Sequence, residues 1–367
     1  MRTFIYTYLL LLSFLISYLL VPVSKKVAQK FNLYDFPGER KIHLTSKPLT
    51  GGVAILFSFL LVVLGNIGAL FIFRDFQFIT SNFPFLPAQI PHLKLVLPKL
   101  SAILISGILI AAVGLLDDLK GPKFSAAKKL AVQFIVALFL VLMGVKTSYF
   151  PGAWLNGIIT VIWIVGIINA FNLLDNMDGL SAGVAIISAA IFFVTTATQG
   201  QFFSAMILIT LVGSLLGFLR YNFHPSSIFM GDSGSLFIGL MLGSLTVTSS
   251  YVTEESPSLL PVIMPVIILS IPIFDTISVI FIRIKERRPI YVGDKRHFSH
   301  RLVNLGMGER EAVLFIYLVT LVIGLSALLL PKLSVWQSLV IVFQAALILS
   351  VVSILMVAGK RGRGNTQ

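Results

Sequence analysis

The sequence predicts an all-α protein, a polytopic bundle of about eleven transmembrane helices that forms one integral-membrane domain over residues 1–367. The composition carries this prediction. Hydrophobic residues make up 57% of the chain and charged residues only 12%, whereas soluble domains carry roughly 25% charged residues. Together with the absence of cysteine, this composition excludes a soluble enzyme, a disulfide scaffold and a disordered chain.

Eleven segments are apolar enough to cross a membrane, because a bilayer core about 30 Å thick requires about 20 apolar residues in a helix. The first segment is expected to be a retained span rather than a signal peptide, since Lys25 and Lys26 follow it where small residues would mark a cleavage site. The expected spans are 3–23, 51–73, 99–116, 130–145, 153–171, 179–198, 202–219, 233–250, 259–282, 312–330 and 335–358.

The distribution of Lys and Arg predicts the orientation, because cytoplasmic loops retain these residues. Counted over alternate loops, 22 of the 28 lysines and arginines fall on one side of the membrane and six on the other. With an odd number of spans, this asymmetry places the N-terminus outside and the C-terminus in the cytoplasm. The net charge of +13 then follows from topology, so no nucleic-acid partner is expected.

Carboxylates are informative in such a chain, because a charge near the bilayer is costly. Five of them fall at the predicted cytoplasmic ends of spans, among glycines and asparagines rather than in the mixed-charge runs that merely solvate helix ends. We therefore expect one polar site at the cytoplasmic face, formed by loops 24–50, 117–129, 172–178, 220–232 and 283–311. The five carboxylates are Asp117, Asp118, Asp175, Asp178 and Asp232.

Asp117 and Asp118 close the third predicted span. Adjacent residues of a helix point about 100° apart, so one carboxylate is expected to face a pocket while the other anchors a neighbouring segment. Two close negative charges also favour a bound cation.

A strip of polar residues occupies every third position across the end of the fifth span, at Asn169, Asn172, Asp175 and Asp178. Amide and carboxylate oxygens suit Mg²⁺, and both groups can hydrogen-bond a base or a sugar. An Asx turn at Asp178 would explain that residue alone. The strip is therefore predicted to surround a small polar ligand.

The next cytoplasmic loop ends with Phe229, Gly231 and Asp232. Asp232 is placed to cap the eighth predicted helix, and the start of that helix, with its glycines, favours phosphate binding. Two interpretations of Phe229 stay open, stacking on a base and packing at the membrane interface.

The longest cytoplasmic loop carries a dense group of cations after Asp294, among them His297, His300 and Arg301. Arginine forks match phosphate oxygens, so the group suits a diphosphate, although basic loops under a membrane also attract anionic lipid. Two histidines three positions apart suit zinc as well, but no softer ligands complete such a site. Asp275, inside the ninth span, is either a proton or substrate residue or the partner of a polar group on a neighbouring helix.

Five motifs in this order resemble the polyprenyl-phosphate N-acetylhexosamine-1-phosphate transferase superfamily, glycosyltransferase family 4. The resemblance spans nearly the whole chain, and it points to the branch that makes undecaprenyl-diphosphate-GlcNAc for O-antigen, enterobacterial common antigen or teichoic acid linkage. The motifs are Lys47-Pro-Leu-Thr-Gly-Gly52, Asp117-Asp118, Asn169-x-x-Asn172-x-x-Asp175-x-x-Asp178-Gly179, Phe229-x-Gly231-Asp232-Ser-Gly-Ser235 and Asp294-x-x-His297-x-x-His300-Arg301.

The resemblance implies transfer of a sugar 1-phosphate, above all GlcNAc 1-phosphate, from a UDP-linked N-acetylhexosamine to undecaprenyl phosphate, with release of UMP. It implies Mg²⁺ as the cofactor, with Mn²⁺ as a substitute, and an active site on the cytoplasmic face of the bacterial inner membrane. Direct in-line attack by the lipid phosphate is favoured over an aspartyl intermediate. Homodimerisation stays open.

Carried over position by position, the motifs assign three groups of residues. The metal ligands are expected to be Asn172 and Asp232. The expected substrate-binding residues are Lys129 at the diphosphate, Asp178 and Phe229 at the uracil, Asn169, and Arg301 over the sugar phosphate. The expected catalytic residues are Asp117, Asp118, Asp175, His297 and His300.

Two alternative functions remain at this stage. The sister branch that acts on the muramyl-pentapeptide nucleotide usually shows three consecutive histidines in the last loop, which this chain lacks. Many members of the favoured branch show His-x-His-His, and Ser299 departs from that pattern in a way that bears on sugar preference. An ion-coupled transporter would hold its acids near the bilayer midplane in repeated halves, whereas these acids lie at one edge.

Overall fold

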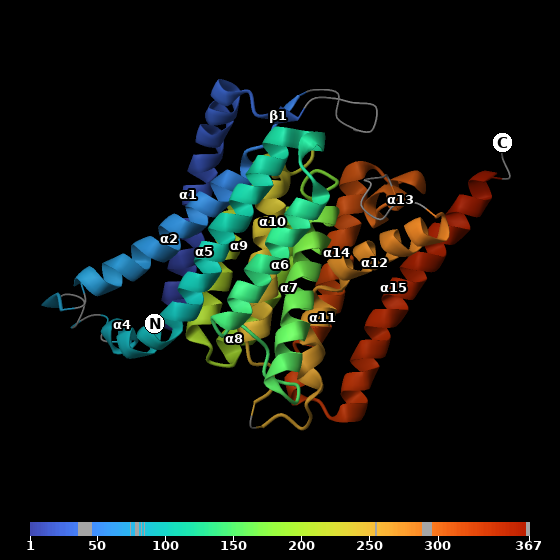
Figure 1. Ribbon diagram of the computed structural model, residues 1–367. Helices are drawn as coiled ribbons and strands as arrows, with labels where there is room; N and C mark the ends of the chain where they lie inside the picture. The colour runs from blue at the N-terminus through green and yellow to red at the C-terminus, as the bar shows by residue number, and fades with distance from the viewer. Residues whose placement is uncertain are drawn as a thin grey trace.

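The structure, a computed structural model, describes residues 1–35, 46–73, 75–77, 81, 83, 85–253, 255–287 and 296–364. Its helices run side by side and form one bundle (Figure 1). Within the described residues, eight helices are long and apolar enough to cross a membrane, and a bent pair of helices adds a ninth crossing if it counts as one span. The predicted all-α, polytopic membrane architecture is therefore confirmed.

The first half of the chain forms the long helices on the left and in the centre of Figure 1. Pro22 and Pro98 lie inside α1 and α5 without ending these helices, and a 3₁₀ turn over Gly121–Lys123 joins α5 to α6. The elements are α1 (Arg2–Phe31), β1 (Tyr34–Asp35), β2 (Lys47–Pro48), α2 (Gly51–Phe73), α4 (Phe85–Ala88), α5 (Ile90–Lys120), α6 (Ala126–Leu142) and α7 (Ala153–Leu174).

The second half completes the bundle and adds one short helix outside it. Further 3₁₀ turns lie over Leu260–Ile263 and Leu330–Lys332. The elements are α8 (Leu180–Thr198), α9 (Phe202–Asn222), α10 (Gly231–Thr248), α11 (Met264–Ile268), α12 (Ser270–Lys285), α13 (Phe298–Asn304), α14 (Glu309–Ala327) and α15 (Val335–Gly364).

Each predicted span other than the ninth corresponds to one helix. Two of these helices, α6 and α10, are not among the eight that pass as membrane spans. Helix α6 has only 17 residues, and α10 opens with the polar sequence Gly231-Asp232-Ser233. Every residue of α10 from Ser233 to Thr246 is buried, so this helix lies at the centre of the bundle and is shielded from lipid by its neighbours.

The ninth predicted span, 259–282, is broken rather than continuous. The 3₁₀ turn and α11 meet α12 at an angle of 69°. Proline cannot donate a backbone hydrogen bond and is tolerated mainly in the first turn of a helix, and Pro261, Pro265 and Pro272 divide this segment into short pieces. Hydropathy alone did not reveal the break, because all the pieces are apolar.

The only strands among the described residues form a small antiparallel ladder that the sequence analysis did not predict. Tyr34 pairs with Pro48, and Asp35 pairs with Lys47. The chain then continues into α2, where the backbone N–H groups of Gly51 and Gly52 donate to Phe229 O at 3.0 Å and Met230 O at 2.8 Å. These bonds fix the segment around Lys47 beside the loop that precedes α10.

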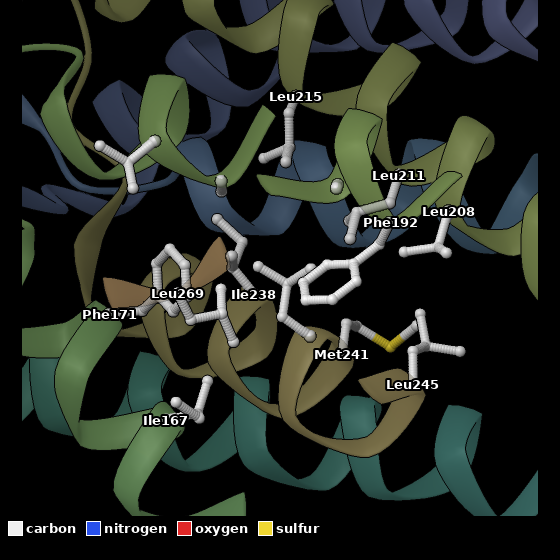
Figure 2. Close-up of a cluster of buried hydrophobic side chains, with 14 of the residues drawn as sticks. Ile167, Phe171, Phe192, Leu208, Leu211, Leu215, Ile238, Met241, Leu245 and Leu269 are labelled. Carbon is white, nitrogen blue, oxygen red and sulfur yellow. The ribbon is translucent and has the colours of Figure 1, made fainter. Parts of the chain in front are cut away.

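The hydrophobic core extends through the whole bundle, and one part of it lies where α7, α8, α9 and α10 meet. Figure 2 shows Phe171 of α7, Phe192 of α8, and Ile238 and Met241 of α10 in one buried cluster. Such a core fixes the ends of these helices relative to one another, because close-packed interiors resist displacement. The polar residues at the helix ends are thereby held in a defined arrangement.

The ladder and α13 lie at the same end of the bundle, at the top of Figure 1, and we call this the upper end. The N-terminus lies at the lower end of α1, and the C-terminus lies toward the upper end (Figure 1). The two termini therefore lie toward opposite ends of the bundle.

Candidate active site at the upper end of the bundle

A cluster of opposite charges joins four helices around the ammonium group of Lys129. Its Nζ lies 2.6 Å from Asp232 Oδ2 and 2.7 Å from Asp117 Oδ2. Asn172 contributes its side-chain carbonyl, with Oδ1 at 3.5 Å from the same Nζ, and its amide donates to Asp232 Oδ1 at 2.9 Å. Residues from α5, α6, α7 and α10 therefore place three oxygen-bearing side chains around one cation.

Asp118 has a different role from that of Asp117. Its Oδ1 accepts the backbone N–H of Asp232 at 2.9 Å, and its Oδ2 accepts that of Ser233 at 3.2 Å. These N–H groups open α10 and have no partner within that helix, so Asp118 caps α10 from α5. The prediction that Asp232 caps its own helix is wrong, because Asp232 lies in the first turn and its side chain contacts Lys129 and Asn172 instead.

Two glycines permit this close approach of α5 and α10. Gly231 has φ +72°, and a Cβ there would lie 2.6 Å from Asp118 Oδ2. A Cβ on Gly114 would lie 2.5 Å from the backbone carbonyl of Asp232. Since real Cβ atoms essentially never come within 3.0 Å of another residue's atoms, a side chain at either position would displace the start of α10 from α5.

Asp175 follows the C-terminal end of α7 and lies in the turn that leads to α8. Desolvation raises the pKa of its carboxyl group to about 8, and the nearby negative charges of Asp232 and Asp178 contribute in the same direction. Burial and the two neighbouring negative charges therefore both favour the protonated form of Asp175.

A second group of contacts surrounds the carboxylate of Asp178. Ser226 donates to it twice, from its backbone N–H at 2.9 Å and from its hydroxyl at 2.7 Å. The ammonium of Lys47 lies 3.3 Å from Asp178 Oδ2 and 4.8 Å from the centre of the Phe229 ring. The structure thus brings the two predicted uracil residues, Asp178 and Phe229, to a single cation.

Lys47 and Ser226 were not singled out as site residues. Lys47 opens the first of the five motifs, which was the available signal, but no chemistry was assigned to it. Ser226 gave no signal, because serine is common in loops and its contact with Asp178 spans 48 positions of the chain. His224 also approaches this group, with Nδ1 at 3.4 Å from Asp178 Oδ2.

A third group joins α12 to α13. Asp275 pairs with a polar group, as one of its two interpretations predicted, and that group is His297, whose Nδ1 lies 2.8 Å from Asp275 Oδ2. Arg301 donates from Nη2 to Ser278 Oγ at 2.6 Å. The predicted basic residues His297 and Arg301 are therefore both attached to α12.

His300 and Ser299 lie in the same short helix. The ring centroids of His297 and His300 are 6.3 Å apart, and Ser299 Oγ donates to Asn176 Oδ1 at 2.5 Å. Through that bond α13 contacts the turn that carries Asp175 and Asp178. Asp294, which opens the predicted motif, lies outside the described residues.

The side-chain amide of Asn169, a predicted substrate-binding residue, donates to groups outside the Lys129 cluster. Its amide donates to Gln133 Oε1 at 2.5 Å and to Val165 O at 2.8 Å, so its side chain bonds to α6 and to its own helix. Across the parts of the chain that the structure describes, no three His, Asp or Glu side chains gather closely enough to hold a metal by themselves. The oxygen set at Lys129 consists of two carboxylates and one amide.

Sequence comparisons with known proteins show which family this chain resembles. A model described as glycosyl transferase family 4 matches residues 100–250, a segment that contains the whole Lys129 cluster. The chain is 34% identical over 352 residues to a probable undecaprenyl-phosphate N-acetylglucosaminyl 1-phosphate transferase of Bacillus subtilis (strain 168), covering 94% of this chain and 90% of that protein. It is 32% identical over 331 residues to a decaprenyl-phosphate N-acetylglucosaminephosphotransferase of Mycobacterium leprae, covering 83% of this chain and 78% of that protein.

A phospho-N-acetylmuramoyl-pentapeptide-transferase of Streptococcus mutans serotype c is also similar, at 38% identity over 163 residues. That match covers 40% of this chain and 48% of that protein. The similarity to this sister activity is therefore partial, whereas the similarity to the GlcNAc-1-phosphate transferases extends over most of both chains.

Proposed function

The chain belongs to glycosyl transferase family 4, among the polyprenyl-phosphate N-acetylglucosamine-1-phosphate transferases, and from that premise we propose that it transfers GlcNAc 1-phosphate from UDP-GlcNAc to undecaprenyl phosphate. The products are undecaprenyl-diphosphate-GlcNAc and UMP. The observation that carries the proposal is the convergence of Asp117, Asn172 and Asp232 on one cation-binding point.

The residues at this point fit a magnesium ion. Mg²⁺ prefers hard oxygen ligands and is held by one or two carboxylates together with phosphate oxygens. Asp232 and Asn172 would hold it, with Asp117 beside them, and the ammonium of Lys129 already occupies a cation position between the two carboxylates. When bound, the metal neutralises phosphate charge and orients the diphosphate.

The reaction is limited by repulsion between two anions. The donor diphosphate carries about two negative charges and the lipid phosphate nearly two, given its second pKa of about 6. Lys129 and Arg301 supply positive charge and hydrogen-bond donors on the protein side. In phosphoryl transfer such positioning and electrostatic stabilisation provide most of the catalysis.

A phosphate oxygen of the lipid attacks the sugar-bearing phosphorus of the donor in line with the bond to UMP. One P–O bond forms, the P–O bond between the two donor phosphates breaks, and its electron pair leaves with UMP. Asp117, which faces the Lys129 cluster, aligns or deprotonates the lipid phosphate. The uracil would bind at Asp178 and the ring of Phe229, the two groups that Lys47 contacts.

The upper end of the bundle is assigned to the cytoplasmic side of the bacterial inner membrane. Eleven crossings, with the N-terminus outside and the C-terminus in the cytoplasm, place the basic loops on that side, as the positive-inside rule requires. The opposite positions of the termini in Figure 1 support an odd number of crossings. The reaction would then be the first membrane step of cell-envelope polysaccharide synthesis.

The test uses purified full-length protein, undecaprenyl phosphate and a panel of UDP-sugars, with UMP release as the readout. We expect release with UDP-GlcNAc, loss of release after chelation of Mg²⁺, and loss in Asp232→Asn. The matched control is Asp75→Asn, an exposed aspartate on a different loop, which should leave the rate unchanged.

Three results would contradict the proposal. Full activity of Asp232→Asn would remove this carboxylate from the metal site. UMP release only with the muramyl-pentapeptide nucleotide would assign the chain to the sister activity. Ion-driven substrate uptake into sealed vesicles without UMP release would indicate a transporter.

A further inference from the structure

The carboxylate of Asp275 is almost completely enclosed by protein. Asp275 is 1% exposed to solvent, and its neighbour His297 is 4% exposed. A buried carboxylate is costly unless both oxygens find donors. Here Oδ1 accepts the backbone N–H of Phe298 at 2.5 Å, and Oδ2 lies 2.8 Å from His297 Nδ1.

These two contacts determine which nitrogen of His297 carries the proton. A carboxylate is only an acceptor, so Nδ1 must be protonated in order to donate to Oδ2. In the neutral ring, Nε2 then carries the lone pair, and it is the nitrogen left for a ligand. A carboxylate on one ring nitrogen fixes both the tautomer and the orientation of an imidazole.

The same surface of α12 also holds the second basic residue of α13. Arg301 stands one helical turn after His297, and it donates to Ser278, which lies three residues after Asp275. Asp275 therefore contacts both the histidine that precedes α13 and the first backbone N–H of that helix. The position of the whole basic helix depends on this carboxylate.

We infer that Asp275 is a positioning residue of the transferase, which holds His297 in the tautomer whose Nε2 can accept a hydrogen bond from a hydroxyl or amide N–H of the donor's sugar. The inference rests on the proposed function for the identity of the ligand. It rests on geometry alone for the tautomer. None of the five motifs contains Asp275.

The first experiment tests the tautomer without requiring transfer activity. Diethyl pyrocarbonate acylates an unprotonated imidazole nitrogen, and peptide mass spectrometry gives the rate at each histidine of the full-length protein. In Asp275→Asn, the oxygen of the amide must accept the Phe298 N–H, because a buried backbone donor requires an acceptor. The NH₂ group then faces His297 Nδ1, and the proton moves to Nε2.

We expect the acylation rate of His297, measured against the exposed His92 in the same sample, to fall about fivefold or more in Asp275→Asn. Asp275→Glu keeps the carboxylate and should retain most of the rate. Thr276→Val is the matched control, because the neighbouring Thr276 hydroxyl is buried without a hydrogen-bond partner, and it should leave the rate unchanged. An unchanged or faster rate in Asp275→Asn would overturn the inference, whatever the transfer assay shows.

The second experiment measures kinetics. Loss of an orienting partner typically reduces activity by about 10- to 100-fold, so we expect Asp275→Asn to lower kcat by that amount, with less than about a threefold change in KM for UDP-GlcNAc. In a His297→Ala background the same substitution should change kcat by less than about twofold. If the kcat losses of Asp275→Asn and His297→Ala multiply in the double variant, Asp275 does not act through His297. If wild-type protein releases no UMP, the proposed function fails, while the acylation result still decides the role of Asp275.

Discussion

The carboxylate of Asp118 accepts the backbone N–H of Asp232 at 2.9 Å, across 114 positions of the chain. A residue at the end of α5 therefore sets the start of α10, and with it the position of the Asp232 side chain at Lys129. The two adjacent aspartates have different partners. Asp117 pairs with the ammonium of Lys129, whereas Asp118 accepts two backbone N–H groups at the start of α10.

Asp118→Asn should reduce stability as well as activity. The amide keeps one acceptor oxygen and turns an NH₂ group toward the second N–H, so one capping bond is lost at a cost of about 1–2 kcal/mol. We expect Tm to fall by a few degrees and UMP release to fall by about 100-fold, since small displacements of catalytic groups have effects of that size. Asp117→Asn is the control, and it should lose activity with little change in Tm. Equal Tm losses in the two variants would contradict the conclusion that only Asp118 holds the start of α10.

Gly231→Ala should separate α10 from α5. The new Cβ would meet Asp118 Oδ2 at 2.6 Å and Leu49 O at 2.8 Å, at a backbone φ of +72°, which only glycine adopts without strain. We expect activity to fall by about 100-fold or more, with a lower Tm. Gly166→Ala on α7 meets no atom within 4 Å, so it should retain activity, because alanine is tolerated better than glycine in a helix interior. Normal activity in Gly231→Ala would show that the approach of the two helices is adjustable.

Much of the fold follows from the sequence, because membrane-spanning helices need long apolar runs and the order of loops then alternates between two sides. The break in the ninth span could not be read from hydropathy, since its pieces are all apolar and the 69° angle depends on packing. A spacing of three residues also placed Asn169 with Asn172, although only Asn172 reaches Asp232. Which face of α7 meets α6 and which meets α10 is a property of the assembled bundle.

The contacts of the site also could not be predicted from the sequence, because they join residues that lie far apart along the chain. The sequence identified Asp118, Asp232 and Asp178 as unusual carboxylates, but their partners lie 48 to 115 positions away. A capping aspartate supplied by another helix gives no local signal, whereas Asp232 stands next to the start of α10 and has the residue type of a cap. Lys47 stands in a motif, yet its place between Asp178 and Phe229 depends on the ladder that joins β1 to β2.

Phe229→Ala should weaken nucleotide binding. Stacking of a base on an aromatic ring contributes about 1–3 kcal/mol, so we expect KM for UDP-GlcNAc and the Kd for UMP to rise about tenfold or more, with a smaller change in kcat. Phe229→Tyr keeps the ring and should bind nearly as well as the wild type. An unchanged KM in Phe229→Ala would reject stacking and favour a packing role for this residue.

Asp175→Asn should change how stability depends on pH. The pKa of Asp175 is raised to about 8 in the folded protein, against about 3.9 in an unfolded chain. The folded state therefore binds the proton more tightly, and the wild type loses stability as the pH rises from about 4 to about 8. Asparagine has no such proton, so Tm of the variant minus Tm of the wild type should increase over this range and level off above pH 8.

The measurement is a series of thermal unfolding curves of the full-length protein from pH 5 to pH 9, with a chelator present so that bound metal does not alter the charge balance near Asp232. Asp75→Asn provides the control for removal of an exposed carboxylate elsewhere in the chain. Parallel Tm curves for Asp175→Asn and the wild type would show that Asp175 titrates normally. If the Tm of Asp175→Asn minus that of the wild type falls with rising pH, the folded protein stabilises the charged form of Asp175. Asp175 would then be a charged neighbour of the Lys129 cluster.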